Sequence, residues 1–312
     1  MAAGKDTPAA GAGAARWKLI RREVEAFNRN RPAVERTMYK GMARMMLPFV
    51  LVVLAIAIVA QMQGATGITV IVLALAVLIG FGLRRLVLKP LDDLRDRNRE
   101  RLLPVIYGQI DDFRYIRDET PDVMPWLHKI ELIPFHSSLH AGTITGRHGG
   151  TVFTLSETEL LADEGRRARS LFEGTMFHFR REVFFPGTFI AQSRADAAAG
   201  ALFSDDELGD VSAPGGEPSD RILFRSTNPQ AAQALLKGRF AGLPARLDAA
   251  WPDAAWSFAL SNHDCYLFIP ADTRIFDLPP IGKDIDVERD IRPMTDEMRW
   301  FLKLMKDTRN LR

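Results

Sequence analysis

The segment that decides the fold of this chain is residues 143–153, which read TITGRHGGTVF. Two short runs rich in β-branched residues, Thr143–Thr145 and Thr151–Phe153, flank the glycine-rich segment Gly146–Gly150. A turn of this composition between two such runs is typical of a β-hairpin. The sequence therefore predicts an antiparallel hairpin here.

Further strands are expected on both sides of a second turn, Pro186-Gly187, at Thr175–Phe179 and Thr188–Ala191. Later segments with strand character are 222–225, 255–260 and 265–269, and a short helix is expected near 244–250. Residues 194–220 are rich in alanine, glycine and acidic residues without periodicity, which indicates an exposed loop.

Two helices have clear start signals. Asn228 before Pro229 predicts an N-cap for a helix that runs to about Lys237. Near the C-terminus, Thr295 is the expected N-cap of a final helix with an apolar stripe at Met298, Phe301, Leu302 and Met305. Strands first and helices later predict an α+β fold with an antiparallel sheet and packed helices over residues 102–312.

A second decisive feature is residues 45–83, which contain no charged side chain in a chain that is 26% charged. As one helix they would span about 58 Å, nearly twice a hydrocarbon core of ~30 Å. The polar, glycine-containing break from Gln61 to Gly67 suggests two spans, 45–61 and 66–83, with Pro48 in the first turn of the first span. We therefore expect a two-helix transmembrane hairpin, a buried soluble hairpin being the alternative.

The flanks of this block are basic, with Lys40 and Arg44 before it and Arg84, Arg85 and Lys89 after it. Positive charge marks the cytoplasmic side, so both termini are expected in the cytoplasm at a bacterial inner membrane. The expected integral membrane protein divides into a tail (1–44), the hairpin (45–83), a charged neck (84–101) and a cytoplasmic domain (102–312).

The tail is expected to be disordered over residues 2–15. From Arg16 it reads as an amphipathic helix, with Trp17, Ile20, Val24 and Phe27 at helical spacing. Such a helix lies in the headgroup layer of the lipid bilayer, or it is solvated or packed against protein. In the neck, Pro90 can begin a helix that runs to about Arg101.

Charge and cysteine content exclude several classes of protein. Residues 102–312 carry a net charge of −7, which disfavours nucleic-acid binding. Cys265 has no partner in the chain, so a disulfide scaffold is excluded. No ionisable residue lies in 45–83, which disfavours transport. Ala76 and Gly80 have the small-xxx-small spacing of a helix contact, either within the hairpin or in a homo-oligomer.

The order of short motifs resembles a bacterial family, the domain of unknown function 3137 (DUF 3137). The motifs, which span roughly residues 95–280, are Leu103–Ile106, Gly146–Leu155 with Ser156-Glu157, Phe172–Gly174, Phe185–Thr188, Ser226–Pro229 with Ala234–Leu236, Ser257-Phe258, Tyr266–Ile269 and Phe276. The resemblance implies two membrane spans followed by a cytoplasmic α+β domain, no established activity, and a LemA-like membrane protein as a partner. One departure is residues 136–140, HSSLH, where relatives are aromatic and glycine-rich.

That departure supplies the best candidates for a metal site. His136 and His140 share a face in a strand or a helix, and His128 and His148 are near in sequence. Zinc requires three or four ligands with supporting hydrogen bonds, and no acidic partner or CxxC motif reinforces these histidines. We expect scattered histidines rather than a metal, and no cofactor.

Three other groups of residues are candidate sites. Residues 262–265, NHDC, place a thiol beside an imidazole and a carboxylate, but a buried core cysteine is the stronger interpretation. Asp205-Asp206-Glu207 and Asp210 lack the spacing of a calcium loop. Ser156, Glu157 and Glu159 follow the first hairpin and either help to form a groove or make structural hydrogen bonds.

Three functions remain open. The first is a membrane-anchored cytoplasmic binding or regulatory domain of unknown ligand, without enzymatic activity; such a domain can bind peptides by strand addition. The second is a structural or oligomerising component of an envelope assembly. The third is an enzyme without a recognisable motif.

Overall fold

The computed structural model describes residues 8–62, 97–163, 169–194, 202–203, 208–212, 221–252, 254–270, 274–276, 278–279 and 282–309. The chain divides into two compact units. The first unit is Met1–Ile106 with Leu278–Arg292, and the second is Tyr107–Asp277 with Pro293–Arg312.

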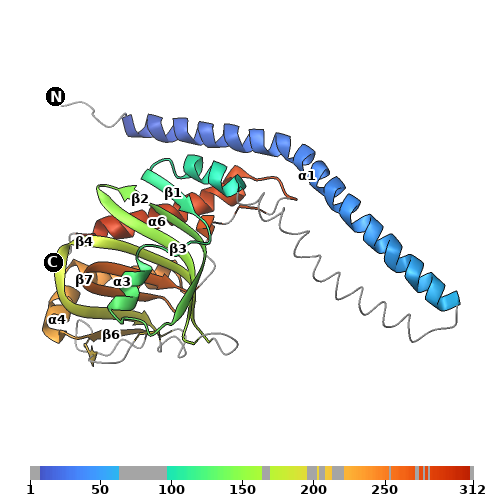
Figure 1. Ribbon diagram of the computed structural model, residues 1–312. Coiled ribbons are helices and arrows are strands. Elements are labelled where there is room, and N and C mark those ends of the chain that lie inside the picture. The colour runs from blue at the N-terminus through green and yellow to red at the C-terminus, as the bar shows by residue number, and fades with distance from the viewer. Residues whose placement is uncertain are drawn as a thin grey trace. The chain divides into compact units, whose positions relative to one another are not determined.

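The first unit is dominated by one long helix, α1 (Pro8–Met62), of 55 residues. Residues 8–15, which were expected to be disordered, already belong to it. Pro32 and Pro48 lie inside the helix. Each proline removes one backbone hydrogen bond, which accounts for the bend that α1 shows along its length (Figure 1).

In the part of the chain that the structure describes, no helix is both long enough and apolar enough to cross a membrane. This finding contradicts the two-helix transmembrane hairpin, and with it the inner-membrane location with both termini in the cytoplasm. Residues 45–61 are not a separate helix with Pro48 in its first turn; they continue α1, and Pro48 is internal. The second expected span, 66–83, lies outside the described residues.

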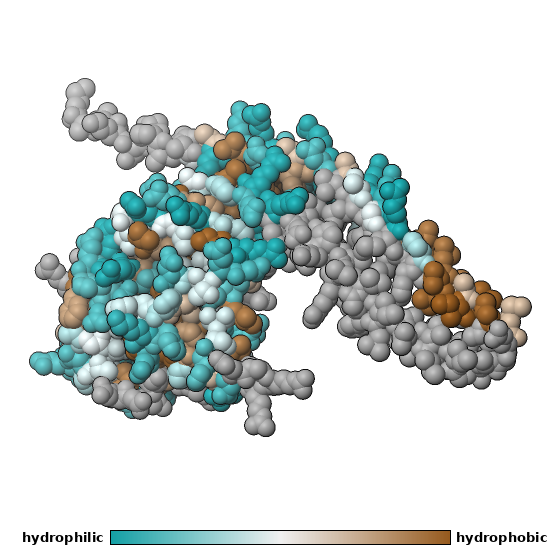
Figure 2. Space-filling model, in the orientation of Figure 1, coloured by the Kyte–Doolittle hydropathy of each residue, from teal (hydrophilic) through white to brown (hydrophobic). Residues whose placement is uncertain are grey.

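The last third of α1 nevertheless exposes many large apolar side chains, which Figure 2 shows as a brown region at the end of the helix. Large exposed apolar patches mark contact surfaces. The exposed residues are Leu47, Leu51, Val52, Leu54, Ile56, Ile58, Val59 and Met62.

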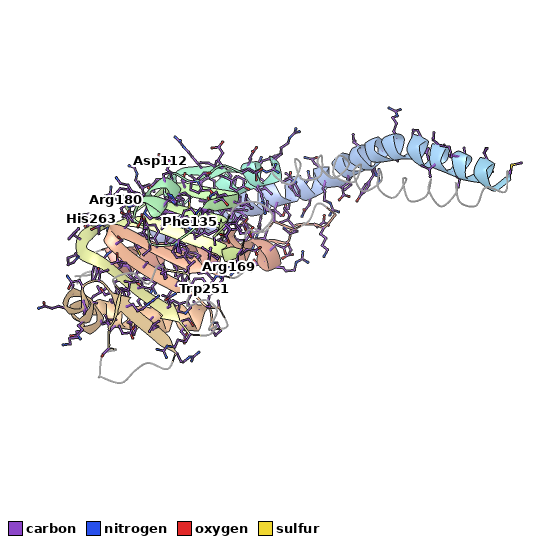
Figure 3. All side chains as sticks on the ribbon, turned by 60° about the horizontal axis from the view of Figure 1, so that its bottom comes forward. Asp112, Phe135, Arg169, Arg180, Trp251 and His263 are labelled. Carbon is purple, nitrogen blue, oxygen red and sulfur yellow. The ribbon has the colours of Figure 1, made fainter. Side chains whose placement is uncertain are left out.

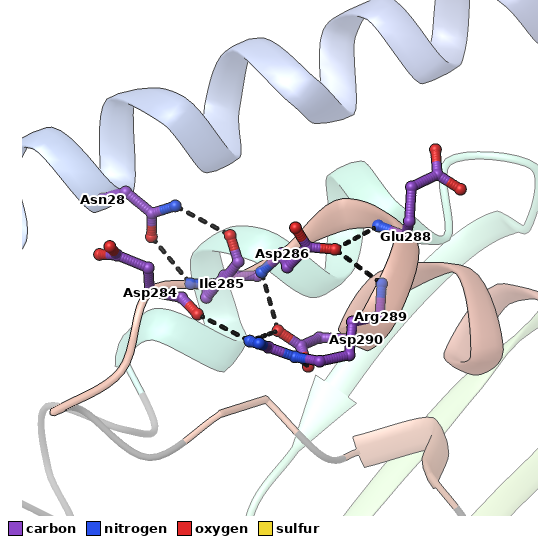
Figure 4. A network of polar contacts seen from close by, with 7 residues as sticks. All are labelled: Asn28, Asp284, Ile285, Asp286, Glu288, Arg289 and Asp290. Atoms are coloured by element: carbon purple, nitrogen blue, oxygen red, sulfur yellow. Dashed lines mark hydrogen bonds and ion pairs between the residues drawn. The ribbon is translucent and has the colours of Figure 1, made fainter.

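The first part of α1 packs within its own unit. Ile20 and Val24 are 1% and 3% exposed, so the amphipathic helix expected from Arg16 packs against protein. Asn28 holds the 284–292 segment through both ends of its amide: Nδ2 donates to the Ile285 carbonyl at 2.8 Å and Oδ1 accepts from the Ile285 N–H at 3.0 Å (Figure 4). The Asn28 side chain thereby pairs with backbone as a neighbouring strand would.

Charged pairs accompany this contact. Arg21 lies 3.1 Å from Glu288, Arg31 lies 3.3 Å from Asp284, and the Arg292 guanidinium lies over the Trp17 ring. A helical segment at residues 97–106, which extends beyond the expected end of the neck, completes the described part of this unit; Glu23 of α1 pairs with its Arg101 at 3.5 Å.

The final helix begins earlier than the sequence indicated. A π-helical turn, η5 (Val287–Ile291), leads directly into α6 (Arg292–Arg309). Asp286 is the N-cap, because its carboxylate accepts from the N–H groups of Glu288 at 2.9 Å and Arg289 at 2.7 Å (Figure 4). Thr295 is therefore an interior, 1% exposed residue, and its assignment as N-cap was wrong.

The second unit is built on one antiparallel sheet with the order β1-β2-β3-β4-β6-β5, and β7 also pairs with β4 (Figure 1). This confirms the antiparallel sheet with helices. The strands are β1 (Asp111–Ile116), β2 (Ser137–His148), β3 (Thr151–Leu161), β4 (Ser170–Ser193), β5 (Gly209–Asp210), β6 (Ile222–Ser226) and β7 (Ser257–Ile269).

The β2–β3 hairpin confirms the prediction from residues 143–153. His148 pairs with Thr151 across the two-residue turn Gly149-Gly150, and both glycines have positive φ, 56° and 83°. Glycine adopts these angles without a steric penalty, as this type of turn requires.

The second predicted pair of strands is a single strand. β4 runs through Pro186-Gly187 and pairs with β3 in its first part and with β6 in its last. The pairing with β7 shifts between Arg180 and Thr188, so the expected turn is a bulge within the strand. The two predicted strands at 255–260 and 265–269 likewise form one strand, β7, with Asn262 at φ 55°.

Helices cover both faces of this sheet. Phe301 of α6 packs on Phe177 of β4, with ring centroids 5.0 Å apart, and the predicted stripe of α6 is buried. A second cluster joins Leu127 of α3 (Met124–Lys129) to Phe172 of β4 and Phe268 of β7. The remaining helices are α4 (Pro229–Lys237), η3 (Arg239–Gly242), α5 (Leu243–Ala250) and η4 (Arg274–Phe276).

Two of these helices confirm predictions made from the sequence. The Asn228 side chain accepts from the Ala231 N–H at 3.1 Å at the start of α4, and α5 covers the predicted 244–250 segment. The 194–220 region is only partly a loop, because Leu202 and Phe203 are buried and residues 209–210 form β5.

Candidate functional site

A pocket lies over the ends of three neighbouring strands of the sheet. Across β2, β3 and β4, Leu139 pairs with Glu159 and Glu159 pairs with Glu173. Glu157, two residues before Glu159, pairs with Thr175 of β4. Residues two apart on a strand share a face, so these side chains converge on one side of the sheet.

The pocket has a volume of ≈ 580 Å³, within the usual range for small-ligand sites. Four carboxylates line it, and none of its described lining residues is lysine or arginine. The lining consists of the acidic residues Asp118, Glu157, Glu159 and Glu173, the hydroxyl residues Thr120, Ser138, Thr158 and Thr175, and Leu139, His140, Ala141 and Gly174.

Gly174 is required where β4 passes β7. Its φ is 155°, and a Cβ at this position would lie 2.2 Å from the carbonyl oxygen of Ile269. Only glycine allows the two backbones to approach this closely. The close approach positions Glu173 and Thr175, on either side of Gly174, in the lining of the pocket.

His140 is 9% exposed and has a hydroxyl group at each ring nitrogen. Its Nε2 lies 2.9 Å from Ser138 Oγ, and its Nδ1 lies 3.1 Å from Thr158 Oγ1. Beyond Thr158, the chain of hydrogen bonds continues into the sheet, because Thr158 Oγ1 donates to Ser156 Oγ at 3.0 Å.

This chain of hydrogen bonds fixes the tautomer of His140. A hydroxyl has one proton, and that of Thr158 is given to Ser156, whose own proton can go to the Gly142 carbonyl at 3.4 Å. Thr158 must therefore accept from Nδ1–H of His140. Burial lowers the pKa of His140 below its ordinary value of 6.5, which favours the neutral ring. In the neutral ring Nε2 is then the acceptor, and the Ser138 hydroxyl donates to it.

The other histidines considered for a metal site are dispersed. His136 is exposed and its backbone N–H donates to the Leu161 carbonyl, while the His128 ring packs on Phe135 at 5.4 Å. His140 has hydroxyl groups at both nitrogens, as described above. Within the described ranges there is no group of three or more histidine, cysteine, aspartate or glutamate residues that could hold a metal ion.

In the structure, the side chains of His263 and Asp264 have separate partners, and neither partner is Cys265. Cys265 is fully buried, and burial raises the pKa of its thiol, so the reactive thiolate is disfavoured. His263, labelled in Figure 3, donates from Nδ1 to the Arg181 carbonyl at 3.3 Å. Asp264 instead lies 2.9 Å from Nε2 of His178 on β4. No local pattern in the sequence indicates this pair, because the two residues are 86 positions apart and meet only through strand pairing.

The remaining candidates divide between the pocket and the rest of the chain. Glu157 and Glu159 line the pocket, as a groove-forming role requires. Ser156 is buried, and its hydroxyl group is hydrogen-bonded to the hydroxyl group of Thr143. Asp210 is in β5, and residues 205–207 lie outside the described residues. Sequence reasoning missed Ser138, Thr158 and Glu173, whose roles depend on the cross-strand register.

The fold and the pocket define a one-sheet α+β domain with an acidic pocket. No family model and no curated protein matches this chain. Among solved structures, it is similar to the crystal structure of the mycobacterial trehalose monomycolate transport factor A, TtfA. The two are 13% identical with a TM-score of 0.38, over 68% of this chain and 96% of that chain. The resemblance to the domain of unknown function 3137 family stays a prediction.

Proposed function

We propose that the second unit is a binding domain whose pocket accepts a cationic group, such as the side chain of a lysine or arginine in a partner peptide. The observation that carries the proposal is the lining of the pocket, where Glu157, Glu159 and Glu173 contribute carboxylates and a fourth, Asp118, pairs with Arg117 at 2.8 Å.

The register of the sheet strengthens this interpretation. Glu159 and Glu173 are directly opposite each other, and like charges in that position destabilise a sheet by roughly 0.2–1 kcal/mol. A bound cation would relieve this repulsion. The arrangement therefore favours the ligand-bound form over the empty one.

The neighbouring hydroxyl groups suit the same ligand. An ammonium group has three N–H donors and a guanidinium has five, and both need several acceptors when they leave water. Thr120 and Thr175 add hydroxyl oxygens to the carboxylates of the lining. Leu139 and Ala141 add apolar surface for the aliphatic stem of the side chain.

Calorimetric titration of the full chain with three tripeptides tests the class of ligand. Trilysine is expected to bind, and triglycine and triglutamate are expected not to bind. Affinity for trilysine should decrease between about 0.01 M and about 0.15 M salt, where the screening length shortens from about 30 Å to about 8 Å. Equal binding of all three peptides, or none, would contradict the proposal.

A further inference from the structure

The edge of β2 beside the pocket points to the way in which a partner binds: we propose that an extended peptide adds a strand to the sheet along residues 137–142, with a lysine that faces the carboxylates of the pocket. This inference rests on the proposed function, because the carboxylates hold that lysine. It adds a backbone interaction that binding of a single cationic group does not require.

β2 extends beyond the strand next to it. β1 pairs with residues 143–147 of β2, whereas β2 begins at Ser137. After β1 the chain turns at Asp118, whose φ of 51° is a left-handed conformation that interrupts an extended chain. Residues 137–142 pair with β3 on one side, and in the described part of the chain no strand pairs with them on the other side. We call these six residues the free edge of β2.

The free edge lacks the side chains that usually protect an exposed edge strand. Natural proteins block such edges with lysine or other charged residues, with proline, or with bulges. The free edge reads SSLHAG, without lysine, arginine, carboxylate or proline. Its register shift, between His140 and Gly142, lies at the end next to β1. Leu139 is 59% exposed and Ala141 is also exposed, so a strand can approach this edge.

The pocket lies beside the free edge. β1 and β3 are on opposite sides of β2, and Asp118 and Thr120, which follow β1, line the pocket. Leu139 and Ala141 of the free edge line it as well. The pocket therefore extends from the carboxylates across β2 to the loop that follows β1. An added strand would lie along this path, in line with β1.

The register directs one side chain of the added strand toward the carboxylates. On this face of the sheet, Leu139 is followed by Glu159 and then by Glu173 on successive strands. Neighbouring strands are about 4.8 Å apart, so the backbone of a residue paired with Leu139 would lie roughly 10 Å from that of Glu159. A lysine suits this position, because its apolar stem can lie on the exposed Leu139 while its ammonium group reaches Glu159.

The residues on either side of that lysine face the opposite side of the sheet, where the side chains of Ser138 and His140 lie. His140 is buried, with a hydroxyl group at each ring nitrogen, and Leu160, the partner of Ser138 on β3, is also buried. A second charged side chain would lose water there without an opposite charge in return. The preferred peptide therefore has one lysine between two β-branched apolar residues, which also favour the extended conformation.

Charge favours a peptide over a second copy of this chain. Two free edges that paired with each other would bring the Glu159 and Glu173 side chains of both copies closer together. Residues 102–312 also carry a net charge of −7. Like charges oppose such pairing, whereas a cationic peptide is attracted to the same surface.

Calorimetry of the full chain with three acetylated and amidated peptides, at about 0.01 M salt, tests the proposal. The first peptide is TVKVT. The second has the same side chains but carries methyl groups on the backbone nitrogens of its three central residues, and the third has norleucine in place of lysine. TVKVT is expected to bind at least about 10-fold more tightly than either, because the second peptide cannot donate backbone hydrogen bonds and the third has no cation.

Hydrogen exchange and two variants locate the bound peptide. TVKVT should slow exchange of the N–H groups in residues 137–142, and the methylated peptide should not. Leu139→Lys should weaken TVKVT binding at least about 10-fold, because a lysine on an edge strand opposes pairing and its ammonium group competes for Glu159. Phe184→Lys is the control, since Phe184 is similarly exposed, at 54%, and lies outside the pocket lining. It should bind TVKVT as the wild type does.

The outcomes distinguish the two proposals. Equal affinity for TVKVT and its methylated form, while trilysine still binds, overturns strand addition alone. Absence of binding by all of these peptides, trilysine included, overturns both proposals. Unchanged affinity of Leu139→Lys for TVKVT overturns the placement at the free edge. Protection of residues 137–142 that rises with protein concentration in the absence of peptide would assign the edge to a second copy and overturn the peptide as its occupant.

Discussion

Glu159 of β3 and Glu173 of β4 are direct cross-strand partners, so two carboxylates occupy neighbouring positions in the lining of one pocket. Like charges directly opposite each other destabilise a sheet. This pairing supports the proposal that the pocket binds a cationic ligand.

Glu159→Gln should therefore stabilise the empty protein. Removing one of the two charges relieves a repulsion of about 0.2–1 kcal/mol, and the free energy of unfolding should rise by that amount. Urea unfolding of the full chain measures it. Asp163→Asn, which removes an exposed charge outside the pocket lining, serves as the control and should leave stability unchanged; a loss of stability in Glu159→Gln would contradict the account.

The stability of the protein should depend on the protonation of His140. Burial lowers the pKa of His140 in the folded chain below 6.5, so the unfolded chain binds the proton more readily. The stabilising contribution of the neutral ring is complete above the ordinary pKa and is lost as pH falls from 6.5 through the lower folded value.

Urea titrations at several pH values, for the wild type and for His140→Gln, isolate this contribution. The difference between the two should be largest above the ordinary pKa of 6.5 and should diminish toward acid. The carboxylates that face this pocket, Asp118, Glu157, Glu159 and Glu173, are present in both proteins. A difference that does not change with pH would show that His140 is not held neutral.

Gly174→Ala should destabilise the second unit. The added Cβ meets the Ile269 carbonyl at 2.2 Å, and φ is 155°, so the cost should exceed about 1 kcal/mol. Gly209→Ala is the control, because the nearest atom to its Cβ is 3.8 Å away. Thermal unfolding of both variants checks this, and similar melting temperatures for the two would contradict the close approach of β4 and β7.

Asn28→Ala should release Ile285 in the first unit. It removes both hydrogen bonds of the amide, each worth about 1 kcal/mol. Hydrogen exchange at the Ile285 N–H should accelerate, since that group loses its acceptor. Asn30→Ala, an exposed position on the same helix, should have no effect; protection of Ile285 that survives Asn28→Ala would show that other contacts hold the segment.

Short sequence patterns correctly predicted the turns and helix caps whose structure is determined by a few neighbouring residues. The Gly149-Gly150 turn and the Asn228 cap are recognisable because their chemistry lies within a few positions. The β4 and β7 strands were divided wrongly, because polar and proline residues inside a bulge resemble a turn. The N-cap at Asp286 was missed because a π-helical turn precedes α6.

The pocket could be predicted only in part. Glu157 and Glu159 were noted for their place after the hairpin, and His140 was noted as a metal candidate. Glu173 and Thr158 join them through the register of three strands, which sequence spacing does not reveal. The uncharged block 45–83 suggested a transmembrane hairpin, whereas its described part continues α1.

The most direct test of the central claim is the affinity of trilysine for the Glu159→Gln/Glu173→Gln double variant, measured by calorimetry at about 0.01 M salt beside the wild type and Asp163→Asn. The account predicts that the double variant binds about 5-fold or more weakly, as expected from the loss of two exposed charge interactions, while Asp163→Asn binds as the wild type does. Equal affinity in all three proteins would show that the cation does not bind in this pocket.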